Sequence, residues 1–302
     1  NDLTDYQVLV ELNSTNFNFA HAQTNGEDIR FTDVEGNLLS YWIEEWDAVN
    51  ETAKVWVKVP SIPANGTVEI WLYYGNGEVT DASDGGATFE FFDDFSGIHT
   101  LADYTIVDDG TGYAPSDWEL DTINKKIIQH SNIWSSIGDD HFGSAMLTGV
   151  NLANFEVRVE TKEGDDDIIG LVFCYQDNSH FYHYSYTNDY SGRDAAGDDC
   201  TRGSYRWIGK DDDAICVSNL ASDNNAPATT DIVEIKIRRY ENVIKVFQDG
   251  VEILSATDAT YGAGDIGLMT DGCAGGEFHP PFIIRKYTEP EPSVSIGGEE
   301  TP

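Results

Sequence analysis

The sequence predicts an all-β protein made of two β-sandwich domains. Short runs in which apolar and polar residues alternate with period two follow one another along the chain, separated by turns rich in Gly, Pro, Asn and Asp. No run has the 3.6-residue period of an amphipathic helix. At 302 residues the chain is too long for one small core and suits two domains.

The first part of the chain contains short β-type runs with turn-forming segments between them. The runs cover residues 6–12, 29–32, 40–46, 53–59 and 67–74. In the fourth run the three valines share one face, while Lys54, Trp56 and Lys58 share the other. We therefore expect one face in a core and one face in solvent, which favours antiparallel pairing in a small sandwich.

A change of composition marks the boundary between two domains. Residues 80–86 are polar and rich in Asp and Gly, and the aromatic run 89–95 follows them. The tail after Glu289 is rich in Pro, Gly and Glu. We expect a small sandwich over residues 1–79, a linker over 80–88, a larger domain over 89–288 and a linker or tail over 289–302.

The larger domain contains the most informative stretch of the chain, a hairpin signal. Two aromatic-rich runs, 171–176 and 180–186, alternate with period two, and Asp, Asn and Ser stand between them as turn residues. This pattern puts Leu171, Phe173 and Tyr175 on one face of the first strand. Later strands are expected at residues 232–238, 243–247, 251–254, 264–269 and 282–287.

The strong acidity of the chain limits its partners. The sequence has 54 Asp and Glu residues against 17 Lys and Arg, a formal net charge of −37. Repulsion disfavours nucleic acid and anionic lipid as ligands. No stretch approaches the ~20 apolar residues that span a bilayer, so we expect no membrane span in this chain. The acidity fits either solubility in a salty or surface setting or a set of divalent-cation sites.

Clusters of Asp in predicted loops are the candidate cation sites. Calcium takes about six to eight oxygen ligands from carboxylates and carbonyls, and such clusters supply them. The clusters are Asp93-Asp94, Asp139-Asp140, Asp165-Asp166-Asp167 and Asp211-Asp212-Asp213. We take Asp93, Asp94, Asp165, Asp166 and Asp167 as the candidate metal ligands, with calcium in a structural role. None has EF-hand spacing, and a solvated turn explains each cluster as well.

Aromatic residues of the hairpin supply a second candidate site. Tyr182, Tyr184 and Tyr186 share one face of a strand, and flat rings suit the apolar faces of sugars. In the alternative, this face belongs to the core, and Phe181 and His183 point outward. The candidate ligand-binding residues are Tyr182, Tyr184, Tyr186, Arg206 and Trp207.

The cysteines all lie in the second part of the chain and lack the CxxC spacing of a zinc ribbon. Cys200 and Cys216 bracket one loop and are the preferred disulfide pair, which leaves Cys174 with Cys273. Four cysteines allow three pairings, and free buried thiols are the alternative. A disulfide across the 200–216 loop would preorganise Trp207 at the rim of a binding site.

Motifs in the first domain carry a resemblance to a known family. The segments 3–10, 28–33, 41–44, 55–60 and 70–76 occur in order over about 75 residues. Together they resemble a prokaryotic domain of unknown function that recurs in large archaeal and bacterial surface proteins, commonly before a concanavalin-like domain. The family usually opens with a strand upstream of Leu3 that is missing here, so either the chain was cut or another chain supplies a strand.

The hairpin carries a second resemblance. An acidic loop, Gly-Leu-Val-Phe, Tyr-Gln-Asp-Asn and an aromatic pair, within residues 164–186, resemble laminin-G and thrombospondin carboxy-terminal domains. These are concanavalin A-like jelly rolls of extracellular proteins, so the resemblance implies that fold here. It also implies a structural calcium where the opening strand meets the closing strand, which makes Asp94 the best ligand. The closing segment 275–281 lacks the acidic residue that relatives carry after Phe.

These features favour a non-catalytic module, extracellular or at the cell surface, that binds a polysaccharide or surface glycoprotein. The first alternative is a structural or adhesive subunit of a filament or stalk that self-assembles by strand addition, with residues 292–296 as a donor. The second alternative is a glycoside hydrolase or lyase. Jelly-roll glycosidases need two catalytic carboxylates, commonly in an alternating pattern on one strand, and the nearest match here is Glu156 and Glu160, with Arg158 between them. Sequons at Asn13, Asn50 and Asn65 are candidate glycosylation sites if the chain is secreted.

Overall fold

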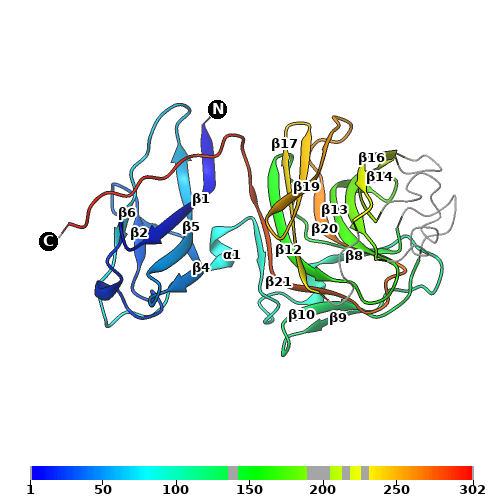
Figure 1. The fold of residues 1–302 in the computed structure, drawn as a ribbon, viewed down its shortest axis with the longest axis horizontal. Coiled ribbons are helices and arrows are strands. Elements are labelled where there is room, and N and C mark those ends of the chain that lie inside the picture. Colours follow the sequence, from blue (N-terminus) through cyan, green and yellow to red (C-terminus); the bar gives the residue numbers. More distant parts are fainter. Residues whose placement is uncertain (1, 135–141, 189–204, 213–217, 226–230, 301–302) are drawn as a thin grey trace. The chain divides into compact units, whose positions relative to one another are not determined.

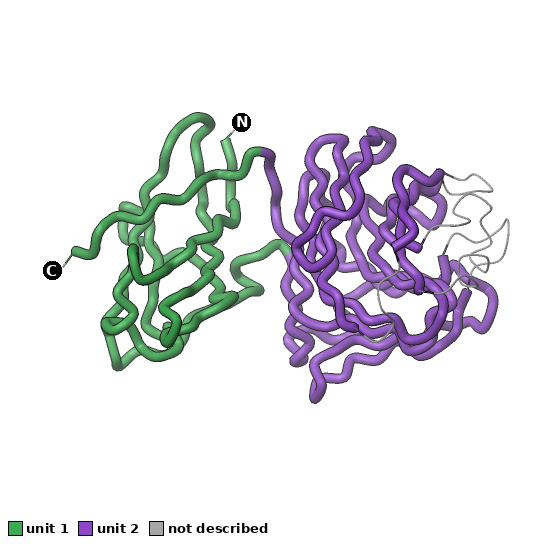
Figure 2. Tube along the Cα trace, in the orientation of Figure 1, with its two compact units in different colours: residues 1–90, 290–302 green, residues 91–289 purple. Residues whose placement is uncertain are grey.

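The chain forms two compact units. The computed structural model describes residues 2–134, 142–188, 205–212, 218–225 and 231–300. Unit 1 comprises residues 1–90 and 290–302, and unit 2 comprises residues 91–289 (Figure 2). Unit 1 therefore takes residues from both ends of the chain. Strands dominate both units, which confirms the all-β prediction (Figure 1). The described helical turns are η1 (Phe19–His21), α1 (Gly85–Thr88) and η2 (Leu101–Asp103).

Unit 1 is a small sandwich of two three-stranded antiparallel sheets. One sheet has the order β1 (Leu3–Asn13), β5 (Thr52–Ile62), β4 (Tyr41–Asp47), and the other has the order β3 (Leu38–Leu39), β2 (Arg30–Thr32), β6 (Trp71–Tyr73). Alternate residues of β1 and β5 meet in one buried cluster with Phe31 of β2. Its β1 and β5 members are Tyr6, Val8, Val10, Leu12, Ala53, Val55, Val57 and Val59.

The other face of β5 is only partly in solvent. Lys54 is exposed as predicted, but Trp56 is 8% exposed, because the ring of Phe89 packs edge-on against it at a centroid distance of 5.9 Å. The indole Nε1 of Trp56 donates to Glu44 at 2.7 Å. The expectation of a fully wet face was therefore wrong at Trp56, since alternation along a strand does not reveal what later segments cover.

The segment after Glu289 packs on unit 1. The hydroxyl of Tyr6 donates to Glu291 at 3.0 Å, and Ile296 is partly buried against the unit 1 core. Glu299 lies 2.7 Å from Nδ1 of His21. Burial, together with a hydrogen bond to Glu299, raises the pKa of Tyr74 to about 12. These contacts tie the last described residues to the first ninety.

Unit 2 is a larger sandwich of two antiparallel sheets, and its fold is the predicted concanavalin A-like jelly roll (Figure 1). The eight-stranded sheet has the order β19 (Val251–Thr257), β18 (Val243–Gln248), β17 (Val233–Tyr240), β12 (Phe155–Lys162), β21 (Gly276–Lys286), β10 (Lys126–Gln129), β9 (Trp118–Asp121), with β7 (Phe91–Asp93) also pairing with β21. The seven-stranded sheet has the order β16 (Ser218–Asp223), β15 (Arg206–Asp212), β14 (His180–Tyr186), β13 (Ile168–Asp177), β20 (Asp265–Asp271), β11 (Ser144–Leu147), β8 (Thr105–Asp108).

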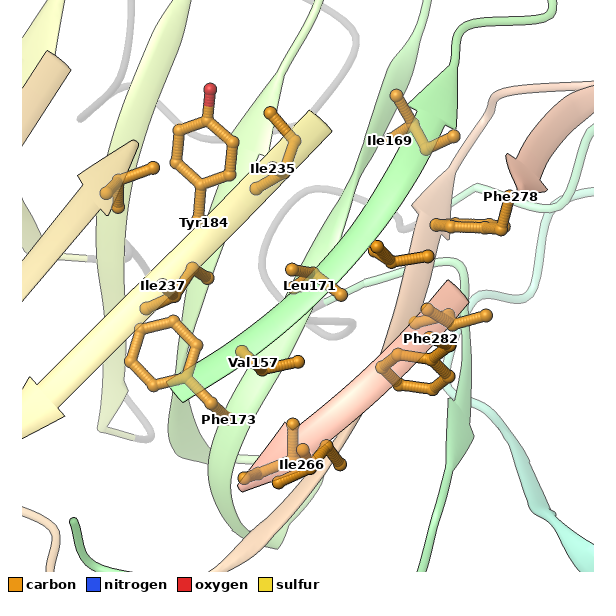
Figure 3. Close-up of a cluster of buried hydrophobic side chains, with 14 of the residues drawn as sticks. Val157, Ile169, Leu171, Phe173, Tyr184, Ile235, Ile237, Ile266, Phe278 and Phe282 are labelled. Atoms are coloured by element: carbon orange, nitrogen blue, oxygen red, sulfur yellow. The ribbon is translucent and has the colours of Figure 1, made fainter. Parts of the chain in front are cut away.

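The core of unit 2 lies between these two sheets. Val157 on β12 and Ile237 on β17 come from the eight-stranded sheet, and Leu171, Phe173 and Tyr184 come from the seven-stranded sheet (Figure 3). Each of these side chains is fully buried. Burying one such aliphatic or aromatic side chain contributes about 1.5–3 kcal/mol, so this layer dominates the stability of the unit.

The predicted hairpin is formed by β13 and β14, but an irregularity in β13 changes one face assignment. Leu171 and Phe173 face the core as expected. At Cys174 the backbone has φ +52°, and the pairing register shifts on both sides of the strand. Because of this shift Cys174 also enters the core, and Tyr175 joins a second cluster on the opposite face of the sheet. The prediction that Tyr175 shares the face of Phe173 was therefore wrong.

The contacts of the final segment predict that it stabilises unit 1. We expect Ile296→Ala to lower the unfolding free energy of unit 1 by about 1 kcal/mol, since it removes a partly buried side chain from the core. Val294→Ala is the matched control, because Val294 lies in the same segment and is exposed. Chemical denaturation followed by tryptophan fluorescence measures both variants. Equal stability of the two variants would show that the segment does not pack as described.

Candidate functional site

Among the described residues, one group of three acidic side chains could hold a metal ion, and it lies in the loop between β12 and β13. Asp165, Asp166 and Asp167 each place a carboxylate oxygen within 4.8 Å of the others. Asp165 and Asp167 are partly buried, and Asp166 is exposed. The preceding residue pair, Glu163 and Gly164, completes the loop, which we call the acidic loop (residues 163–167).

The acidic loop is held against the turn that joins β20 to β21. Asp165 Oδ2 accepts a hydrogen bond from the backbone N–H of Ala274 at 2.9 Å, and its Oδ1 accepts from Asp167 N–H at 3.2 Å. The N–H of Gly164 donates to the Sγ of Cys273 at 3.4 Å. β12 and β21 belong to one sheet and β13 and β20 to the other, so both connections cross between the sheets at the same end of the sandwich.

Two glycines allow this close approach. A Cβ on Gly164 would lie 2.1 Å from the carbonyl carbon of Gly275, a separation that packed atoms do not reach. Gly272 has φ +74°, which disfavours other residues, and a Cβ there would lie 2.7 Å from Oδ2 of Asp167. The acidic loop and the 272–276 turn therefore need glycine on both sides.

Burial makes ionisation of two carboxyl groups of the acidic loop, those of Glu163 and Asp165, unfavourable. It raises the pKa of Glu163 to about 8, even though Asn188 donates its backbone N–H to Oε1 of Glu163 at 2.9 Å and its side-chain amide to Oε2. Burial also raises the pKa of Asp165, and the neighbouring Asp166 adds to this shift. A cation bound here would favour the ionised carboxylates. The oxygen donors suit a hard divalent ion such as calcium, so the residues present fit the expected ion.

The other proposed metal ligands, Asp93 and Asp94, lie apart from this cluster. β7 does pair with the closing strand β21. Asp93 is buried and accepts from Tyr104 Oη at 2.5 Å, and burial raises the pKa of Asp93. Asp94 accepts from Ser96 Oγ at 2.5 Å and lies 3.6 Å from Nζ of Lys125. Within the described ranges, three grouped acidic ligands occur at residues 165–167 and not here.

The remaining acidic clusters do not form a grouped site in the described part of the chain. Asp139 and Asp140 lie outside the described residues, as does Asp213. Asp211 is buried on β15, and Asp212 pairs with Lys210 at 3.0 Å.

The three candidate tyrosines are core residues and do not form a sugar platform. Tyr182, Tyr184 and Tyr186 are all buried. Tyr184 lies opposite Leu171 and Tyr182 opposite Phe173 in the β13–β14 register, so the tyrosines share the core face of the sheet. As in the alternative assignment, Phe181 and His183 lie on the other face of the strand, but both are buried there and do not reach solvent. The prediction of exposed tyrosines was therefore wrong.

Arg206 and Trp207 also differ from the prediction. They lie on β15 and not in a loop, and both are buried. Arg206 pairs with Asp223, with its Nε 2.9 Å from Oδ1. Trp207 belongs to the cluster on the outer face of the seven-stranded sheet, with its ring edge-on to His183 at 6.3 Å. Neither residue forms a rim, because β-pairing to β14 and β16 incorporates them in the sheet.

The expected Cys174–Cys273 disulfide is absent, and both residues are free buried cysteines. Cys174 lies near the end of β13 that pairs with Asp265, whereas Cys273 follows Asp271, which pairs with Ile168 at the other end. At about 3.3 Å per strand residue the two positions are too far apart for a disulfide. Burial raises the pKa of the Cys174 thiol to about 12. Cys200 and Cys216 lie outside the described residues.

The three sequons lie in unit 1. Asn50 and Asn65 are exposed. Asn13 is partly exposed at the end of β1, and its Oδ1 accepts from Thr15 N–H at 2.9 Å. Modification of these positions stays a prediction.

The sequence predicts Asp165, Asp166 and Asp167 as metal ligands but does not reveal the residues that support them. Glu163 and Gly164 precede the three Asp residues directly, and the Gly-Cys-Ala-Gly-Gly turn lies more than a hundred residues later. A glycine-rich turn at the start of a closing strand is the one signal that could have indicated a partner loop. Its pairing with the acidic loop depends on sheet topology, which composition does not determine.

Comparisons with known proteins agree with the two resemblances at a coarse level. Residues 25–119 match the family model of a domain of unknown function, DUF2341, and residues 114–197 match that of the thrombospondin C-terminal region. The second match includes the acidic loop and the β13–β14 hairpin. No curated protein matches the chain in sequence. Among the described residues, no helix is long and apolar enough to cross a membrane.

Solved structures with a similar fold include three from Bacillus species. The carbohydrate-binding module CBM66 of Bacillus subtilis has 15% identity and a TM-score of 0.44, over 60% of this chain and 99% of its own. A B. subtilis protein of unknown function with a galectin-like fold has 11% identity and a TM-score of 0.45, over 66% and 96%. A xylan β-1,4-xylosidase of Bacillus halodurans has 14% identity and a TM-score of 0.45, over 85% and 52%.

The close approach at Gly164 predicts a large effect of a single methyl group. We expect Gly164→Ala to destabilise unit 2 by about 2 kcal/mol or more, because backbone atoms of Gly275 must move. Gly262→Ala is the matched control, since nothing lies within 4 Å of a Cβ there. Thermal unfolding of the two variants measures the difference. Two equally stable variants would contradict the described contact between the loop and the turn.

Proposed function

We propose that unit 2 is a non-catalytic module that binds a polysaccharide or surface glycoprotein, with a structural calcium ion in the acidic loop. The proposal includes a location outside the cell or at the cell surface. The observation that carries it is the group formed by Asp165, Asp166 and Asp167, held against the 272–276 turn at one end of the sandwich.

Calcium, when bound, would supply positive charge and coordination sites for oxygen atoms. Asp165, Asp166 and Asp167 are the residues that would hold it. Asp165 also anchors the loop through the N–H of Ala274. The protein part of such a site is therefore already ordered by hydrogen bonds between the acidic loop and the 272–276 turn.

The ligand class is inferred from fold and charge. Concanavalin-like jelly rolls include lectin domains, and this architecture supports carbohydrate as the ligand by analogy. The net charge of −37 favours neutral over anionic ligands. The match to the thrombospondin C-terminal region supports an extracellular setting.

The environment of Glu156 argues against this residue as the general acid of a glycosidase. Its Oε1 lies 2.9 Å from Nε of Arg285 and its Oε2 lies 2.5 Å from Nε of Arg238. Burial alone would raise the pKa of Glu156, but these two arginines hold it at about 2. A glycosidase general acid needs a raised pKa, so Glu156 is unsuited to that role. Arg158, between the two glutamates, lies 3.7 Å from Glu234.

A structural or adhesive subunit is the second candidate function. In the described part of unit 1, the 11-residue strand β1 has β5 as its one strand neighbour and forms the edge of its sheet. An edge strand can add a strand from another chain. Sedimentation of the purified chain at increasing concentration tests self-assembly, and a monomer at all concentrations would exclude it.

The proposed function predicts calcium-dependent glycan binding that needs the acidic loop. We expect the full chain to bind at least one glycan of an array in calcium but not in EDTA, and we expect the double variant Asp166→Asn, Asp167→Asn to lose this calcium-dependent binding. We also expect that variant to bind calcium at least about tenfold more weakly by calorimetry, since charge and ligand number set the affinity. Asp231→Asn is the control, because Asp231 is exposed outside this loop.

Each part of the proposal can fail separately. No glycan binding in calcium or EDTA would exclude the binding module and favour the structural function. If the full chain binds the same set of glycans with the same strength in calcium and in EDTA, calcium has no role in binding. Equal calcium affinity in the wild type and the double variant would exclude the acidic loop as the site.

A further inference from the structure

Unit 1 exposes large apolar side chains on one face of its second sheet. On β6, Trp71 is 38% exposed and Tyr73 is 55% exposed, and Leu38 on β3 is 72% exposed. The residues that alternate with the two aromatics, Ile70 and Leu72, pack against the unit 1 core. Trp71 and Tyr73 therefore point away from the core.

These exposed residues form one strip across the sheet. Thr32 on β2 is paired with Trp71 on one side and with Leu38 on the other. Neighbouring strands are about 4.8 Å apart, so Leu38 and Trp71 flank Thr32 in one row. Tyr73 lies two residues along the same strand, about 7 Å from Trp71. We call Leu38, Trp71 and Tyr73 the aromatic strip.

The sheet beneath the strip is fixed by hydrogen bonds. Arg30, which is paired with Tyr73, donates through its guanidinium to the carbonyls of Glu27 at 2.9 Å and Thr80 at 2.6 Å. Oγ1 of Thr32 donates to the carbonyl of Asp33 at 3.0 Å. The two polar residues of β2 are thus held by backbone groups, and the rings beside them rest on an ordered support.

The size of the strip favours a small or linear ligand over a protein. A large side chain buries about 150–250 Å², so the exposed parts of three such residues amount to roughly 300–400 Å². A stable protein interface needs about 800 Å² on each partner. The strip alone is therefore too small for a stable dimer, whereas two neighbouring rings can cover successive units of an extended polymer.

The charge of unit 1 favours an uncharged ligand. Arg30, Lys54 and Lys58 are the only Lys and Arg residues in the segment 1–90, which contains far more Asp and Glu. Such a surface repels anionic lipids and acidic polysaccharides. Trp and Tyr offer flat apolar faces with polar tips, which match the apolar faces and hydroxyl groups of neutral sugars.

We propose that the aromatic strip is a separate binding site for uncharged polysaccharide chains, with Trp71 and Tyr73 as stacking residues. This site is independent of the proposed function of unit 2, and it needs no metal ion.

Affinity electrophoresis of the full chain tests this site. Native gels are cast with a soluble β-glucan, a xylan or a mannan, with alginate as the anionic comparison, and all are run in EDTA. We expect retardation in at least one neutral gel and none in alginate. We expect the double variant Trp71→Ala, Tyr73→Ala to raise Kd by about tenfold or more, since two stacking side chains are lost.

The matched control is Val49→Ala, because Val49 is 91% exposed in the same unit and lies outside the strip. The control should be retarded like the wild type. Equal retardation of the wild type and the double variant would overturn the proposal. A wild type that is not retarded in any of the neutral gels would also overturn it. A wild-type dimer that becomes a monomer in the double variant would overturn it in favour of a protein partner. These outcomes do not affect the calcium-dependent binding proposed for unit 2.

Discussion

The structure of unit 2 depends on the packing of its two sheets through the alternating residues of the β13–β14 hairpin. Leu171 and Phe173 lie opposite Tyr184 and Tyr182, so one face of the hairpin joins the core shared with β12 and β17. The register shift at Cys174 ends that alternation and turns Tyr175 to the outer face. Every later strand of the seven-stranded sheet is placed against this hairpin, directly or through a neighbour.

The same sandwich brings the acidic loop to its partner. The β12–β13 and β20–β21 connections both cross between the sheets, and they meet because β12 pairs with β21 and β13 pairs with β20. Gly164 and Gly272 permit the approach, and Asp165 bridges the two connections. Residues more than a hundred positions apart thereby form one group whose carboxylates are partly shielded from water, which raises the pKa of Glu163 and Asp165.

Alternation and turn chemistry predicted the strands, the hairpin and the sandwich class, because these depend on neighbours in sequence. They did not reveal which face of a strand is covered. The tyrosines of β14 and Trp207 are buried, and Trp56 is covered by Phe89, because sheet stacking and distant segments decide exposure. Likewise the Cys174–Cys273 pairing failed, since the two positions lie at opposite ends of neighbouring strands, and strand order is a property of the whole sheet.

We propose that the acidic loop and the 272–276 turn hold a cation as one unit. Hydrogen exchange of the full chain, followed by mass spectrometry in calcium and in EDTA, tests this proposal. We expect calcium to slow exchange at residues 163–167 and 272–276 together, because the ion would fix the acidic loop against the turn. Unchanged exchange at both segments, or slowing confined to the region of Asp93 and Asp94, would contradict it.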